Sequence, residues 1–254
     1  MFLFSNIFNL GGSSGRSQRK AESRNFRIPL IGESAPSFTA ESTSGTINFP
    51  KDYGNYWKII LSHPMDFTPV CSTELIELAK LQDEFEKTGV KLLVVSTDPL
   101  DTHKQWKTIL ENIDYKGYDL QKINFPILDD SNLVIAKLYG MIHLETDNNK
   151  DVRGVFIIDP DNKIRAEYFY PQEIGRNMDE ILRTVIALQT SDRDKVMTPA
   201  NWEMGHDVIV PFPLKSNMAL MNKESGEYYQ YSWFMIFKKD INRSQKKKGE
   251  IYFD

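Results

Sequence analysis

Residues 56–96 read YWKIILSHPMDFTPVCSTELIELAKLQDEFEKTGVKLLVVS, and this stretch decides the fold. It begins and ends with short apolar runs, 56–62 and 90–96, which are typical of strands covered on both faces. The segment between them, from Cys71 to Lys87, places its large apolar side chains at helical spacing. The stretch therefore predicts a β-α-β unit.

The chain beyond this unit continues to alternate between helix and strand patterns. A second helix is predicted over Leu100 to Ile113, and a final helix is predicted to begin at Asn177, with Glu180 placed as in a capping box. Further strands are predicted over residues 124–129, 152–159 and 163–170, the last two forming a hairpin. This mixture of β-α-β and hairpin elements indicates an α/β fold with a mixed sheet.

Length and composition indicate a globular protein and exclude several classes of function. The chain has 254 residues, of which 41% are hydrophobic, so it can bury a substantial core. Its formal net charge of -4 provides no overall basic field to attract nucleic acid. No run approaches the ~18 apolar residues of a membrane span. The four histidines are scattered and there is one cysteine, so we expect no metal site, no bound cofactor and no internal disulfide.

The loop between the first predicted strand and helix carries the residues of chemical interest. Thr68 suits the N-cap of the helix, and Pro69 suits the first helical position, where its missing N–H costs nothing. Cys71 then occupies the third position, beside unpaired backbone N–H groups and the positive end of the helix dipole. This position favours the thiolate, which is the nucleophilic form of cysteine. The alternative is an inert cysteine that packs as a small hydrophobic residue.

The residues around Cys71 resemble a known motif. Pro64, Thr68 and Cys71 stand at the spacing Pro-x-x-x-Thr-x-x-Cys, which is similar to the active-site motif of the peroxiredoxins. Arg153 and the segments 170–177 and 198–202 resemble the one-cysteine subfamily. The resemblance implies a thioredoxin-like fold, in which helices flank a mixed central sheet, followed by a small C-terminal peroxiredoxin domain. It also implies a homodimer.

The same resemblance implies a role for each matching residue. Cys71 is expected to attack a peroxide oxygen, which gives a sulfenic acid. Arg153 is expected to hold the thiolate, Thr68 to orient the peroxide and Pro64 to shield the sulfur from water. His63 and Arg176 match positions that line this substrate pocket. From the residues alone, an arginine that opens a strand, such as Arg153, is more often a member of a surface ion pair. A proline in a strand-to-helix loop, such as Pro64, needs no function.

The predicted function is that of a thiol-specific peroxidase in antioxidant defence, acting on hydrogen peroxide and organic hydroperoxides. With no second cysteine in the chain, an external thiol such as glutathione or a thioredoxin-type protein must reduce the sulfenic acid. The alternative is a non-catalytic thioredoxin-like module that senses redox state or acts as a chaperone.

Both ends of the chain differ from the middle. Residues 1–27 carry five basic residues against one acidic residue and open with apolar side chains at helical spacing, which is typical of a mitochondrial presequence. A plastid address and a disordered start on a cytoplasmic protein are the alternatives. We expect the peroxidase domain over residues 28–190, a C-terminal dimerisation segment over 191–233 and a basic tail over 234–254.

Overall fold

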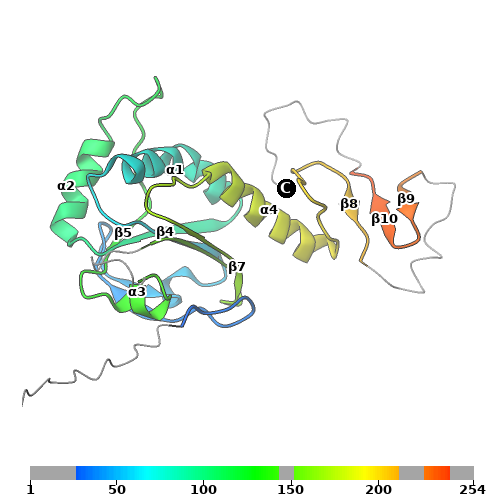
Figure 1. Cartoon of the computed structure of the whole chain (residues 1–254), viewed down its shortest axis with the longest axis horizontal. Helices are drawn as coiled ribbons and strands as arrows, with labels where there is room; N and C mark the ends of the chain where they lie inside the picture. Colours follow the sequence, from blue (N-terminus) through cyan, green and yellow to red (C-terminus); the bar gives the residue numbers. More distant parts are fainter. Residues whose placement is uncertain (1–26, 143–151, 212–225, 241–254) are drawn as a thin grey trace, which may run out of the picture.

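A five-stranded mixed sheet lies at the centre of the computed structural model, which describes residues 27–142, 152–211 and 226–240 (Figure 1). β3, β4 and β5 run parallel, whereas β6 is antiparallel to both β3 and β7. The strand order is β5 (Ile127–Asp129), β4 (Val90–Ser96), β3 (Trp57–Ser62), β6 (Arg153–Ile158) and β7 (Ile164–Tyr170). The predicted mixed sheet, the β-α-β unit and the hairpin are confirmed.

Helices cover both faces of this sheet, and a smaller sheet lies apart from it (Figure 1). One face carries α1 (Pro69–Lys87), α2 (Leu100–Leu110) and α4 (Met178–Asp194). The other face carries α3 (Val134–Leu138), β1 (Phe38–Ala40), β2 (Ile47–Phe49) and the short helix η1 (Lys51–Tyr53). The smaller sheet contains β8 (Val208–Ile209), β10 (Met235–Lys238) and β9 (Tyr228–Ser232) in that order.

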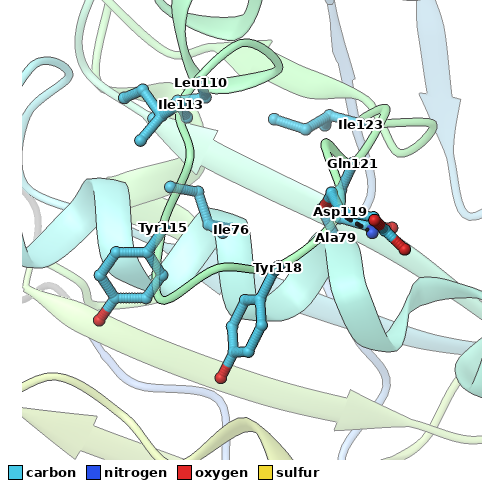
Figure 2. Close-up of a pocket in the computed structure, with 9 residues that line it drawn as sticks. All are labelled: Ile76, Ala79, Leu110, Ile113, Tyr115, Tyr118, Asp119, Gln121 and Ile123. Carbon is cyan, nitrogen blue, oxygen red and sulfur yellow. Dashed lines mark hydrogen bonds between the residues drawn. The ribbon is translucent and has the colours of Figure 1, made fainter.

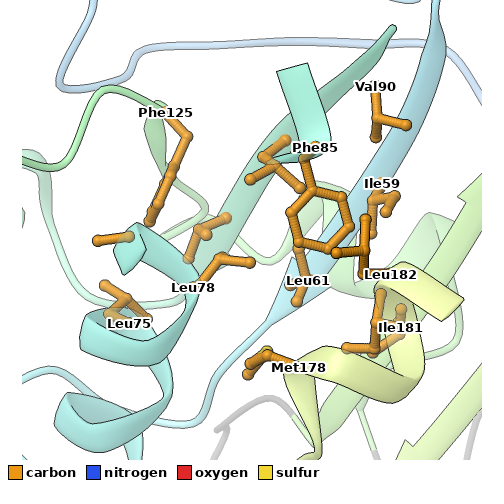
Figure 3. Close-up of a cluster of buried hydrophobic side chains, with 14 of the residues drawn as sticks. Ile59, Leu61, Leu75, Leu78, Phe85, Val90, Phe125, Met178, Ile181 and Leu182 are labelled. Atoms are coloured by element: carbon orange, nitrogen blue, oxygen red, sulfur yellow. The ribbon is translucent and has the colours of Figure 1, made fainter. Parts of the chain in front are cut away.

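The central strand β3 supplies both halves of the core, because every one of its side chains is buried. Ile59 and Leu61 join the cluster under α1 and α4, while Ile60 joins the cluster on the opposite face. Figure 3 shows Phe85 of α1 packed beside Ile59 and Leu61, with Leu182 of α4 nearby. Each such burial contributes about 1.5–3 kcal/mol, so the later turns of α1 are held firmly against the sheet.

Two predicted elements are shorter in the structure. The second helix ends at Leu110 rather than Ile113, because the next backbone hydrogen bonds are three-residue turns and the Ile113 side chain is exposed. The strand predicted from residue 124 begins only at Ile127, after Pro126, which has no N–H to donate to a ladder. No helix in the described residues is long and apolar enough to cross a membrane.

The last helix begins where predicted, but only one of the two hydrogen bonds of a capping box forms. Asn177 is the N-cap of α4, and its Oδ1 accepts from the backbone N–H of Glu180 at 3.1 Å. The Glu180 carboxylate accepts from Arg183 Nε at 2.6 Å instead of closing the capping box. Residues 1–26 of the predicted presequence, His143 and residues 241–254 of the predicted basic tail lie outside the described residues. Within the described part of that tail, Met235–Lys238 form β10.

Candidate active site

Cys71 lies at the third position of α1, as the sequence predicts, and its side chain is completely buried. Thr68 precedes the helix in extended conformation and Pro69 begins it. The Thr68 side chain does not cap the helix, however: its hydroxyl donates to the Met65 carbonyl at 2.9 Å. Thr68 is thus the N-cap residue, as predicted, but its side chain accepts no backbone N–H of the first turn.

Arg153 opens β6 and reaches the sulfur of Cys71. Its Nη1 lies 3.3 Å from Cys71 Sγ and donates to Glu74 Oε2 at 2.7 Å. Its Nε and Nη2 both donate to the Gln172 carbonyl, at 3.0 and 2.6 Å. The residue is 2% exposed, so the surface ion pair considered from sequence is not what forms. A positively charged side chain therefore lies directly against the sulfur.

Glu74 is a site residue that sequence reasoning missed. Its carboxylate lies between two guanidinium groups, because it also accepts from Arg176 Nη2 at 2.7 Å and Arg176 Nε at 2.9 Å. Burial opposes its ionisation, but Arg176 and Arg153 together hold the pKa of Glu74 below its usual range. The only sequence signal was its place three residues after Cys71, which puts both side chains on one face of the helix.

Arg176 connects three elements beneath the thiol. Besides Glu74 of α1, it contacts β3 and β6, since its Nη1 donates to the Ser62 carbonyl at 2.9 Å and to the Gly154 carbonyl at 2.8 Å. Protein groups therefore engage all three of its side-chain nitrogens. The side chain is buried, and its charge is balanced by Glu74.

His63 belongs to a second buried polar cluster, which contains two residues that the sequence did not single out. Its Nε2 lies 2.7 Å from Asp66 Oδ1, and His103 Nδ1 lies 2.6 Å from Asp66 Oδ2. The two histidine bonds outweigh burial and lower the pKa of Asp66. Because an ionised carboxylate only accepts, each ring donates to it. Burial lowers the pKa of His63, against the opposing effect of Asp66, and so disfavours the charged form of its ring.

Of two hollows that lie beside α1 in the described residues, the second touches the site. Figure 2 shows the first, a small and mostly apolar recess between α1, the end of α2 and the following loop. None of the predicted site residues lines it. The second is an open groove of about 400 Å³ with a polar lining. Glu74 and Arg176 form part of its wall, so it reaches the Glu74–Arg153–Arg176 network next to Cys71.

Pro64 is buried in the loop before α1.

A buried thiol at a helix N-terminus, contacted by arginine and mounted on a thioredoxin-like sheet, defines a thiol-dependent peroxidase. The AhpC/TSA family model matches residues 31–167, and the model of the C-terminal domain of 1-Cys peroxiredoxin matches residues 187–225. The chain belongs to the peroxiredoxin family and is of the one-cysteine type.

Several known proteins are similar over most of this chain. A peroxiredoxin of Methanosarcina mazei is 47% identical over 219 residues, which cover 85% of this chain and 100% of that protein. A mitochondrial peroxiredoxin of Saccharomyces cerevisiae is 38% identical over 82% of this chain and 80% of its own length. A solved structure of a yeast mitochondrial 1-Cys peroxiredoxin has a TM-score of 0.74 and 37% identity, covering 84% of this chain and 100% of that one.

Proposed function

We propose that Cys71 is the residue that reduces peroxide and that Arg153 stabilises its thiolate. The observation that carries this proposal is the 3.3 Å contact between Arg153 Nη1 and Cys71 Sγ, at the third position of α1. Both the helix N-terminus and the guanidinium favour an anion on sulfur. Cys71 is the only cysteine of the chain, so no other thiol can take this role.

The reaction proceeds in two stages. The Cys71 thiolate attacks one oxygen of the peroxide, so an S–O bond forms as the O–O bond breaks, and the departing oxygen leaves as water or an alcohol after protonation. Cys71 is thereby oxidised to a sulfenic acid and the peroxide is reduced. An external thiol then attacks the sulfenic sulfur and releases water, and a second thiol frees Cys71 from the mixed disulfide.

Thr68 and Pro64 complete the proposed catalytic loop. The half-buried Thr68 hydroxyl donates to Met65 in the resting state, and its lone pairs remain available to accept from a peroxide. Buried Pro64 excludes water from the sulfur side of the loop. His63 and Arg176 are the further residues proposed to line the substrate pocket. Arg176 supports this by lying in the wall of the open groove, whereas His63 is fully buried against Asp66.

The substrates proposed are hydrogen peroxide and organic hydroperoxides, and the proposed reductant is glutathione or a thioredoxin-type protein. The solved yeast structure concerns thiol resolution through the glutathione and thioredoxin systems, which supports such a reductant for this chain. Cys71 has no exposed surface, so the larger thiol requires a transient opening of the first turn of α1.

The test mixes reduced protein with one equivalent of hydrogen peroxide and follows peroxide loss and intact mass. Rapid loss with a sulfenic or sulfinic adduct on Cys71 supports the peroxidase. Slow loss with unmodified protein supports the alternative, a non-catalytic redox-sensing or chaperone module. The assay is then repeated with glutathione, or with thioredoxin and its reductase. The mixture that sustains peroxide turnover contains the reductant.

A homodimer is part of the proposal, with residues 28–190 as the peroxidase domain, 191–233 as the dimerisation segment and 234–254 as a basic tail. Large side chains are exposed at the end of β9 and in the turn to β10, where Tyr231 is 75%, Trp233 69% and Phe234 52% exposed. Such surface favours contact with another chain. Light scattering after size-exclusion chromatography tests this, and a monomer mass at micromolar concentration contradicts it.

Mitochondrial import is the proposed location, with the cytoplasm as the alternative. The basic, nearly acid-free residues 1–27 and the mitochondrial yeast relative support it. Fusing residues 1–30 to a fluorescent protein tests it: organellar signal with a shortened product supports import, whereas a diffuse full-length product contradicts it. If the chain is imported, the mature chain is expected to begin near Phe26 to Ile28.

A further inference from the structure

The ladder between β3 and β6 stops just short of Arg153. Its last pair is Leu61 with Val155, and the next pairs would set Ser62 opposite Gly154 and His63 opposite Arg153. On its other side β6 stays paired with β7 up to Arg153 itself. Something other than the ladder therefore fixes the β3 side of the backbone at the residue that contacts Cys71.

The Ser62 side chain makes the hydrogen bonds to β6 at the point where the β3–β6 ladder has ended. Its hydroxyl donates to the Val152 carbonyl at 2.5 Å and accepts from the Gly154 N–H at 2.8 Å, so it bridges both neighbours of Arg153. A hydroxyl suits this place because it both donates and accepts. Gly154 N also lies 3.0 Å from the Val152 carbonyl, so the backbone turns tightly at Arg153.

The fit around this hydroxyl is close. Ser62 is completely buried, and a Cβ added at Gly154 would meet Ser62 Oγ at 3.2 Å. Arg176 Nη1 secures the carbonyls of Ser62 and Gly154 from another direction, at 2.9 and 2.8 Å. Ser62 is thus the one side chain of β3 that holds both peptides flanking Arg153.

We propose that Ser62 is a positioning residue of the peroxidase reaction: its hydroxyl sets the backbone turn that directs the Arg153 guanidinium onto the Cys71 sulfur. The inference rests on the proposed role of Arg153. Without the hydroxyl, Arg153 is still present, but its guanidinium is held less firmly against the Cys71 sulfur. The ionised fraction of Cys71 then falls and its reaction with peroxide slows, although no group that touches the peroxide has been changed.

The experiment compares Ser62→Ala with Ser96→Ala in the full chain. Ser96 is equally buried, at the end of neighbouring β4, and its hydroxyl makes only a long 3.4 Å contact with Asp98 N. We expect Ser62→Ala to shift the thiolate absorbance titration to higher pH and to slow the peroxide reaction by between about 3-fold and 10-fold. Ser96→Ala is expected to leave both unchanged. Equal effects of the two variants overturn the proposal.

A double-mutant cycle separates this inference from the role of Arg153. If Ser62 acts through Arg153, Ser62→Ala has no further effect on rate in an Arg153→Met background, and an undiminished effect there overturns the inference. If Arg153→Met alone changes nothing, the proposed role of Arg153 is what fails. Should Ser62→Ala not fold, Ser62→Thr keeps the hydroxyl: a wild-type titration supports the proposal and a shifted one contradicts it.

Discussion

Replacing Glu74 by glutamine removes one negative charge from between two buried guanidinium groups. The carboxylate is 2% exposed and accepts from Arg153 Nη1 and Arg176 Nη2, both at 2.7 Å. Glu74→Gln deprives both buried guanidinium groups of their shared carboxylate. Breaking a buried ion pair in this way costs roughly 3–5 kcal/mol. We therefore expect the free energy of unfolding to fall by about this amount at pH 7.

Urea unfolding followed by circular dichroism measures the loss, with Glu77→Gln as the matched control. Glu77 lies one turn later on α1, and its partner Lys116 is 53% exposed, so the control is expected to lose far less. The pKa of Glu74 is depressed in the folded state, so its contribution is present above the unfolded value and is lost as pH falls through the folded one. Equal losses for the two variants would refute the reasoning.

Three further predictions concern the same site. Arg153→Met is expected to slow the peroxide reaction at least ~10-fold, which equals about 1.4 kcal/mol, and an unchanged rate and thiolate titration contradict its role. Asp66→Asn can accept a hydrogen bond from only one of His63 and His103, so we expect a loss of about 1–3 kcal/mol in urea unfolding; wild-type stability argues against the cluster. Because the folded pKa of His63 is lowered, the unfolded chain binds more protons below about pH 6.5 and stability falls on acidification. His63→Gln is expected to flatten that dependence between pH 7 and 5, and an unaltered slope counts against it.

The elements that the sequence predicts well are those with local signals. Thr68 and Pro69 mark the start of α1, and Asn177 marks the start of α4, because caps and first-turn prolines act within four residues. The end of α2 was placed too late because helical spacing alone does not show where packing stops. Ile113 keeps the spacing, but it lies beyond the last helical hydrogen bonds and is 38% exposed at the rim of a recess beside α1.

The residues missed from sequence owe their roles to contacts between distant parts of the chain. Glu74 and Arg176 are separated by 102 positions and Ser62 and Gly154 by 92, so no spacing rule connects them. Asp66 and His103 meet only because α2 packs beside the loop before α1. The motif around Cys71 indicates which atoms react, whereas the fold determines which groups hold them.

The most direct test of the central claim is peroxide consumption by Cys71→Ser, measured beside the wild type with an excess of thiol reductant. Serine keeps the size of the side chain and removes the only thiol, so the variant is expected to retain the wild-type circular dichroism spectrum. The account predicts that its peroxide consumption does not exceed that of the reductant alone. Appreciable turnover by the folded variant would contradict it, because the peroxide would then be reduced at another group.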